Sequence, residues 1–148
     1  MSSSVERTSV PRIYAAGDVT EQVCTRHGAA VRIETWDNAN RQGEAAASHV
    51  AAPESESAST MTDLPPPPWF WSDQYGANMQ VVGAPGRADC VVASADDTDR
   101  KLSIHLRDGI VVGAVAINGA RDMRRLRKLM AERAPVTRAL LEAQGFVA

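Results

Sequence analysis

Short segments that contain apolar residues follow one another in the second half of the chain, alternating with polar residues over 101–107 and continuously apolar over 110–117. They predict four strands, over residues 78–82, 89–93, 101–107 and 110–117. Asp108-Gly109 separates the last two segments, and this dipeptide favours the type I′ turn of a two-residue β-hairpin. The pattern therefore predicts a small antiparallel sheet in this half of the chain.

Helical spacing follows these strands over about residues 121–133. The apolar side of this predicted helix consists of Met123, Leu126, Leu129 and Met130. Its basic side consists of Arg121, Arg124, Arg125 and Lys128. A short last helix is predicted to begin at Pro135 or Thr137 and to carry Leu140 and Leu141. The basic side is either an ordinary solvated surface or one that attracts an acidic partner.

The first fifty residues are organised around the apolar run Ile13-Tyr14-Ala15-Ala16, which predicts a short buried strand. Gly17 permits a turn at the end of this strand. Asp18 then places a carboxylate just beyond the carboxyl edge, where open α/β sheets bind ligands. Taken alone, this Gly-Asp pair is also typical of an ordinary strand-to-turn junction.

A helix is predicted to begin at Thr35, a favourable N-cap residue, and to run to about Val50. The preceding residues 20–31 are polar and without a period, which predicts a loop, and residues 32–34 predict a brief extended segment. One strand, one loop and one helix bury too little apolar surface to offset chain entropy. We therefore expect residues 1–51 to require a sheet that this sequence does not contain.

Residues 52–68 combine a Ser/Glu-rich stretch with four consecutive prolines, a composition that predicts a partly stiff linker. The linker would separate a first part, residues 1–51, from a second domain, residues 69–148. The second domain opens with Trp69-Phe70-Trp71 and has enough apolar positions for a core of its own.

Composition narrows the possible functions. The chain has 148 residues, a net charge of −2, 44% hydrophobic and 23% charged residues, which is ordinary for a soluble domain without affinity for nucleic acid or membranes. No apolar run approaches the ~20 residues of a membrane span, and the N-terminus lacks a signal-peptide core, so a cytoplasmic location is expected. The cysteines Cys24 and Cys90 are far apart, and the three histidines do not pair at helical spacing. We expect two free thiols and no metal site.

Four segments together resemble the C-terminal third of the flavin-dependent, NADH-dependent ferredoxin reductases. These serve aromatic-ring dioxygenases and cytochrome P450 systems, within the pyridine nucleotide–disulfide reductase superfamily. The segments are residues 7–19 (RTSVPRIYAAGDV), 32–39 (RIETWDNA), 68–74 (PWFWSDQ) and 113–129. They occur in the family's order at family-like spacing. The resemblance implies an α+β chain: a terminal strand–helix piece of an FAD-binding α/β domain, then a reductase C-terminal domain with a small antiparallel sheet and helices.

The resemblance also implies a partial flavin site. Asp18, beside Gly17, matches the acid that hydrogen-bonds the ribityl chain of FAD. Trp36, with Glu34 and Thr35 beside it, matches a helix N-terminus at the pyrimidine side of the isoalloxazine, where backbone N–H groups stabilise negative charge. Read without the family, the alternative for Trp36 is an interface aromatic residue. No residue has the character of a proton donor or nucleophile, so none is expected to be catalytic.

The Trp69-Phe70-Trp71 segment matches the place where the family's C-terminal domain meets the flavin region, near the ferredoxin. We expect a core or seam role for these aromatic side chains rather than direct contact with a ligand.

In the family, electrons pass from NADH through FAD to an iron–sulfur ferredoxin. This sequence contains neither of the family's two G-x-G-x-x-G fingerprints, one for FAD and one for NADH, so we expect it to be incomplete on its own. One possibility is that an upstream chain carries the FAD and NADH domains. The alternative is a non-catalytic remnant or interaction module that docks a ferredoxin or dimerises. A monomer is expected.

Overall fold

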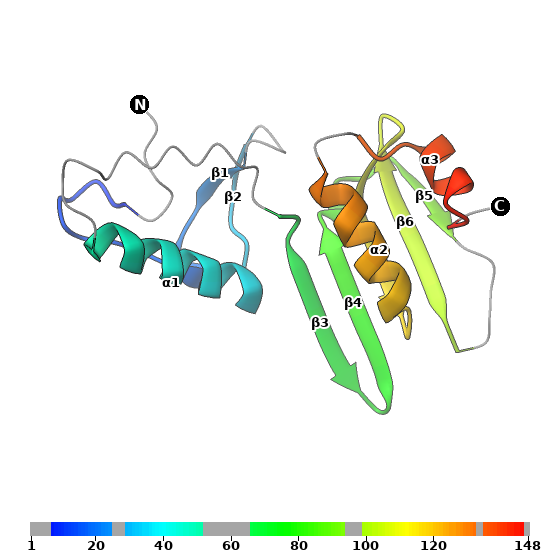
Figure 1. The fold of residues 1–148 in the computed structure, drawn as a ribbon, viewed down its shortest axis with the longest axis horizontal. Coiled ribbons are helices and arrows are strands. Elements are labelled where there is room, and N and C mark those ends of the chain that lie inside the picture. The colour runs from blue at the N-terminus through cyan, green and yellow to red at the C-terminus, as the bar shows by residue number, and fades with distance from the viewer. Residues whose placement is uncertain (1–6, 25–28, 52–65, 94–98, 133–134, 147–148) are drawn as a thin grey trace. The chain divides into compact units, whose positions relative to one another are not determined.

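A computed structural model describes residues 7–24, 29–51, 66–93, 99–132 and 135–146. The chain divides into two compact units, residues 1–64 and 65–148 (Figure 1). Each unit is described below by itself.

The second unit is built on a five-stranded antiparallel sheet. Its strands are β3 (Trp69–Gln74), β4 (Ala77–Gly83), β5 (Cys90–Ala93), β6 (Lys101–Arg107) and β7 (Ile110–Ile117), in the spatial order β3-β4-β7-β6-β5. Two helices follow, α2 (Ala120–Ala131) and α3 (Arg138–Ala143) (Figure 1). This arrangement confirms the α+β class predicted from the sequence.

Two-residue turns close two hairpins of this sheet, β6–β7 and β3–β4. Asp108 and Gly109 have φ of 52° and 75°, and Tyr75 and Gly76 have φ of 51° and 78°. Positive φ at both central residues is the signature of a type I′ turn. The hairpin predicted at Asp108-Gly109 is therefore confirmed, and a second one precedes it.

The apolar core lies between one face of this sheet and the two helices. Its largest fully buried members are Val82 of β4, Ile104 of β6, Met123 and Leu126 of α2, and Leu141 of α3. The buried positions alternate along β6, at Leu102, Ile104 and Leu106, as period-two side chains require. The predicted apolar side of α2 is confirmed, with Leu129 packed at the margin of the core.

The connection from β4 to β5 passes β7 and β6, because β4 and β5 are not neighbours in the sheet. It contains a 3₁₀ turn, η2 (Pro85–Arg87), that contacts both strands. Ala84 donates its N–H to the carbonyl of Val112 at 2.8 Å, which ties this connection to β7. Gly113 lies under it: an added Cβ would be 2.6 Å from the nitrogen of Pro85.

Some of the expected boundaries were wrong. Trp69–Gln74 is an edge strand, paired along its whole length with β4, although its aromatic run does not alternate clearly in the sequence. The predicted linker also ends too late, because Pro67 is buried and Pro68 accepts a hydrogen bond from Gly83 N–H at 2.8 Å. These prolines belong to the second unit. Residues 52–65 of the predicted linker lie outside the described residues.

The first unit contains η1 (Gly17–Val19), β1 (Gln22–Cys24), β2 (Ala29–Val31) and α1 (Trp36–Ala51). β1 and β2 form an antiparallel pair, so the loop predicted over residues 20–31 was wrong at both ends. The start of α1 is confirmed: Thr35 Oγ1 accepts a hydrogen bond from Asn38 N–H at 3.3 Å, which is the bond of an N-cap.

The buried strand predicted at Ile13–Ala16 was wrong. Tyr14 forms only an isolated bridge with Arg7, and Ile13 is 54% exposed. The physical reason is that β1 and β2, the strands described in this unit, pair with one another and offer this segment no sheet. An apolar run predicts burial, but the described part of this unit leaves Ile13 largely exposed.

The first unit is polar inside. Among its described residues the buried side chains are Thr20, Asn38 and Gln42. Its exposed large hydrophobic side chains are Val10, Ile13, Val19, Trp36 and Val50. Among the described residues, every member of the apolar core belongs to the second unit. That residues 1–51 need a sheet from outside this sequence stays a prediction.

Candidate functional site

The Gly17-Asp18 turn follows the extended segment and opens η1, which packs against α1. Gly17 has φ of 81°, a conformation that L side chains rarely adopt. An added Cβ would lie 3.6 Å from Ala39 Cβ of α1. Glycine thus supplies the left-handed turn from which Asp18, an exposed residue, extends.

The second group of predicted site residues surrounds the start of α1. Trp36 is its first residue and is 68% exposed. Thr35 is half-buried and caps the helix, whereas Glu34 is exposed and lies 3.9 Å from Arg32. Such an exposed ion pair contributes little to stability. Trp36 and Asp18 are therefore presented to the surroundings, while Thr35 and Gly17 shape the backbone.

The Gly17-Asp18 turn and the residues at the start of α1 lie against the same helix, α1. Gly17 contacts α1 at Ala39 and Gln42, and Ala39 is only three residues after Trp36. At 1.5 Å of rise per residue, the turn meets α1 about one helical turn from its beginning. The Asp18 turn and the helix start thus share a small region of the first unit.

Three amide side chains join the two groups, of which Gln42 and Asn38 are buried and Gln22 is half-buried. Gly17 N–H donates to Gln42 Oε1 at 2.7 Å, and Gln42 Nε2 donates to Gln22 Oε1 at 3.3 Å. Gln22 Nε2 donates to Asn38 Oδ1 at 3.4 Å, and Asn38 Nδ2 donates to the carbonyl of Ile33 at 3.0 Å. We call these four hydrogen bonds the amide relay. It runs from the residue before Asp18 to the residue before Glu34.

Thr20 reinforces the first end of the relay. Its hydroxyl lies 2.9 Å from Gln42 Oε1 and 2.8 Å from the carbonyl of Gly17, and its one proton serves these two acceptors. Thr20 N–H also donates to the Gly17 carbonyl at 3.0 Å. The turn that bears Asp18 is therefore closed on itself and fastened to Gln42.

Sequence reasoning missed Gln42, Asn38, Gln22 and Thr20, because polar residues on a helix or loop are usually solvated. One signal could have found part of the relay. Asn38 and Gln42 are four residues apart, so they share one face of α1. No large apolar side chain follows that face in the way a core-facing helix requires.

A second candidate feature is the aromatic pair on β3. The rings of Trp69 and Trp71 stack with centroids 4.7 Å apart and planes 26° apart. Trp69 Nε1 donates to Gln80 Oε1 at 3.3 Å, and the guanidinium of Arg127 from α2 lies 4.9 Å from the Trp69 ring centroid. Trp69 is thus half-buried between the sheet and α2, while Phe70, the next residue along the strand, is exposed.

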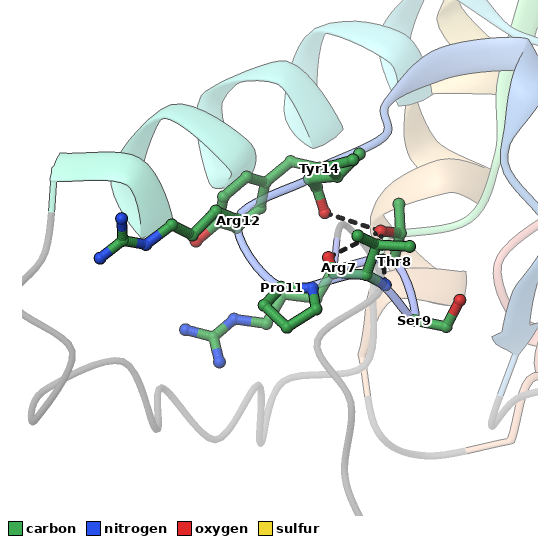
Figure 2. Close-up of a pocket in the computed structure, with 8 residues that line it drawn as sticks. Arg7, Thr8, Ser9, Pro11, Arg12 and Tyr14 are labelled. Atoms are coloured by element: carbon green, nitrogen blue, oxygen red, sulfur yellow. Dashed lines mark hydrogen bonds between the residues drawn. The ribbon is translucent and has the colours of Figure 1, made fainter.

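The segment before Gly17 curls around a hollow of about 410 Å³, lined by residues 7–14. Thr8 Oγ1 bonds the carbonyls of Val10 and Ile13 at 3.1 and 2.9 Å, as the dashed lines in Figure 2 show. Arg12 has a φ of 64°, which turns the chain between them. The hollow is formed by a single loop, and its hydrogen bonds hold that loop together.

Two negative findings apply to the ranges that the structure describes. Within them, no three His, Cys, Asp or Glu residues gather where they could hold a metal ion. No helix there is long and apolar enough to cross a membrane.

The residues present fit one side of a flavin site. An ionised carboxylate such as Asp18 accepts hydrogen bonds from a hydroxyl-rich chain. The start of a 16-residue helix is electropositive and suits a ring that gathers negative charge. The glycine-rich turn that binds a pyrophosphate is not among the 148 residues, so these residues could hold only part of a dinucleotide.

The chain is also similar to known proteins. Residues 69–146 match the family described as "Reductase C-terminal". The chain is 41% identical over 134 residues to the 3-phenylpropionate/cinnamic acid dioxygenase ferredoxin–NAD(+) reductase component of Photorhabdus laumondii, covering 88% of this chain and 31% of that protein.

Two solved structures are similar in fold. In the covalent putidaredoxin reductase–putidaredoxin complex, 93% of this chain matches 31% of the solved chain with 25% identity and a TM-score of 0.76. For the ferredoxin reductase for the CYP199A2 system from Rhodopseudomonas palustris, the shares are 86% and 30%, with 27% identity and a TM-score of 0.72. The chain thus spans about a third of the length of the proteins it matches.

Proposed function

Since this chain belongs to the reductase C-terminal family, we propose that it forms the C-terminal part of a flavoprotein that passes electrons from NADH to an iron–sulfur ferredoxin. The relatives it resembles are ferredoxin reductases of oxygenase systems. Polypeptide beyond these 148 residues would supply the two glycine-rich nucleotide fingerprints.

The observation that carries this proposal is the shared position of Asp18 and Trp36 on the first unit. The Gly17 turn packs against α1 about one turn from its beginning, and both Asp18 and Trp36 are exposed. Asp18 would accept hydrogen bonds from the ribityl hydroxyls of FAD. Backbone N–H groups at the start of α1 would stabilise negative charge at the pyrimidine side of the ring.

Bound FAD would supply the chemistry, accepting a hydride and releasing single electrons. The residues of this chain would bind FAD and orient it. Gly17 gives the turn its left-handed backbone, Thr35 fixes the helix start, and the exposed apolar side chains offer surface to the nucleotide-binding domains. No described residue is assigned a proton transfer.

The partner in this proposal is an iron–sulfur ferredoxin. One relative was solved in a complex with putidaredoxin, which supports a partner of that kind. Arg121, Arg124 and Lys128 on α2 are exposed and could steer an acidic protein. The alternative is that these basic side chains form an ordinary solvated helix surface. An Arg124→Glu variant should weaken ferredoxin binding in a salt-dependent way, whereas Arg87→Glu on η2, a matched exposed control, should not.

The test of the flavin site uses two proteins. The chain alone is mixed with FAD and passed through a gel-filtration column, and its visible spectrum is recorded. A chimera then joins the N-terminal two thirds of the Photorhabdus laumondii relative to this chain, and its flavin content and NADH-dependent ferredoxin reduction are measured.

We expect the chain alone to emerge without flavin and the chimera to retain it. An Asp18→Ala chimera should hold flavin more weakly, and an Asp89→Ala chimera, changed at an exposed carboxylate of the second unit, should not. A chimera that cannot retain flavin while the parent relative can would overturn the proposal. Stoichiometric flavin on the chain alone would show that it needs no other domain.

A second candidate function, an interaction module without flavin, is favoured by one observation. Among the described residues, the apolar core belongs to the second unit, which supports folding of that unit without the first. Ferredoxin binding by residues 66–148 alone, together with a chimera that lacks flavin, would support this alternative.

A further inference from the structure

The amide relay has a direction. Each of its three side-chain amides, Gln42, Gln22 and Asn38, accepts at its oxygen and donates from its nitrogen toward the next member. Hydrogen bonds arranged in this way polarise and strengthen one another. One end of the relay is a backbone N–H and the other is a backbone carbonyl, so both ends are anchored in the chain itself.

Its two ends are the neighbours of the predicted flavin residues. Gly17 precedes Asp18, and Ile33 precedes Glu34, two residues before Thr35. These backbone segments are separated by the β1–β2 pair along the chain. Side chains thus connect the two segments directly.

Because two of its amides are buried, the relay fixes the position of the Gly17 turn against α1. Gln42 and Asn38 are each only 4% exposed. A buried amide without a partner costs about 1–3 kcal/mol, so a placement of the turn that moved both Gly17 N–H and the Thr20 hydroxyl away from Gln42 would leave its Oε1 without these two donors. The described part of the first unit buries no large apolar side chain that could hold the turn instead.

We propose that Gln42 is a positioning residue: its buried amide fastens the Gly17-Asp18 turn to α1 and so sets where the Asp18 carboxylate stands relative to the helix start. The consequence for FAD rests on the function proposed above. Gln42 does not touch the flavin in this account, and it acts through Gly17 and Thr20.

The experiment measures hydrogen exchange of the Gly17 amide by NMR in the full chain, without added flavin. Gln42→Leu keeps much of the side chain's volume but removes both polar atoms. Gln42→Glu keeps an acceptor for Gly17 and Thr20 and loses the donor to Gln22. Ser48→Ala is the control on the same helix, because the Ser48 hydroxyl donates to the carbonyl of Glu44 in the preceding turn and is not a member of the amide relay.

The Gly17 amide should exchange about tenfold faster in Gln42→Leu, which corresponds to one lost buried hydrogen bond. Gln42→Glu and Ser48→Ala should stay within about threefold of the unchanged chain, near the precision of such bond estimates. The proposal is overturned if Gly17 is unprotected in the unchanged chain, or if Gln42→Leu leaves its exchange unaltered. Equal losses in the leucine and glutamate variants would also overturn it, because they would indicate disturbed packing.

A Gln22→Ala variant keeps the test decisive if Gln42→Leu does not fold. It removes the middle of the relay and leaves the Gly17–Gln42 bond in place. Gly17 exchange should then rise by less than tenfold, while the side-chain NH₂ signals of Gln42 and Asn38 shift together. No shift at Asn38 would contradict a connected relay.

Flavin retention in the chimera separates this proposal from the function it rests on. If the chimera holds FAD, Gln42→Leu should weaken FAD binding about tenfold and Gln42→Glu should restore it. Weakening by both variants would contradict positioning through the acceptor. If Gly17 protection depends on Gln42 but no chimera holds FAD, the positioning role stands and the flavin function fails.

Discussion

Replacement of Gly113 by alanine tests how the second unit accommodates its crossing connection. An added Cβ at this position would lie 2.6 Å from the nitrogen and 2.7 Å from Cδ of Pro85, and 2.9 Å from the Val82 carbonyl oxygen. Two of these three atoms are backbone, and the third is in a rigid ring, so none can swing aside. The change must push η2 away from β7.

Overpacking of this kind costs about 1–3 kcal/mol. For a unit of this size, 2 kcal/mol lowers the melting temperature by roughly 8–16 °C. Gly86→Ala is the matched control, because Gly86 lies in the same connection and its added Cβ would meet nothing within 4 Å. A surface change of that kind is expected to alter stability by no more than about 0.5 kcal/mol.

The assay is urea unfolding followed by tryptophan fluorescence in a Trp36→Phe background, so that emission comes from Trp69 and Trp71 of the second unit. Gly113→Ala should lower the urea midpoint without changing the slope, since the surface exposed on unfolding stays the same. Equal midpoints for Gly113→Ala and Gly86→Ala would refute the steric argument, and would mean that the connection can lift from β7 at little cost.

Three further predictions concern single interactions. Gly43→Ala should raise the helical signal in circular dichroism and stabilise α1 by up to ~1 kcal/mol, because the added Cβ meets nothing within 4 Å and alanine favours the helix. Unchanged helicity would contradict this prediction. Asp122→Asn should lower the free energy of unfolding by about 1–3 kcal/mol, because the buried Asp122 Oδ2 lies 3.0 Å from Nη1 of Arg100. An unchanged urea midpoint would show that this ion pair contributes nothing to stability. Thr137→Val should cost about 1 kcal/mol by removing the cap bond from Leu140 N–H, and Thr137→Ser should not; equal losses would point to packing instead.

Local sequence patterns were sufficient to predict the elements whose bounds depend on residues close in sequence. The bounds of β6 follow from its alternation, those of β7 follow from its apolar run, and the Asp108-Gly109 turn separates the two strands. The last helix begins after Thr137, one of the two predicted starts. In each case the determinants are neighbours in sequence, or lie across a two-residue turn.

The failures have a common physical cause, which is dependence on distant residues. Ile13 has the pattern of a buried strand, but burial also needs a partner sheet, and apolar spacing does not say whether one is present. β3 lies at the sheet edge, and its pairing with β4 rather than its own pattern defines it. Gln42 has the composition of a solvated helix residue, and only the folded turn at Gly17 gives it a reason to be buried.

Within the candidate site, Asp18, Gly17, Thr35, Trp36 and Glu34 were predicted through family resemblance. Their contact with a flavin stays a prediction. What the structure adds is the polar scaffold beneath them, which no resemblance had indicated.

Where the structure describes the first unit, its buried side chains are polar and its large apolar side chains are exposed, and this inversion links its folding to mass action. A unit that hides its apolar side chains only on binding gains about 1.4 kcal/mol of stability for each tenfold rise in partner concentration above the dissociation constant. The second unit carries its core internally and gains nothing by this route. In a chain without such a partner, the second unit would keep its full stability, and the first unit would lack the added stability that binding provides. The stability of the first unit would then rise with the concentration of a partner that covers Ile13, Val19 and Trp36.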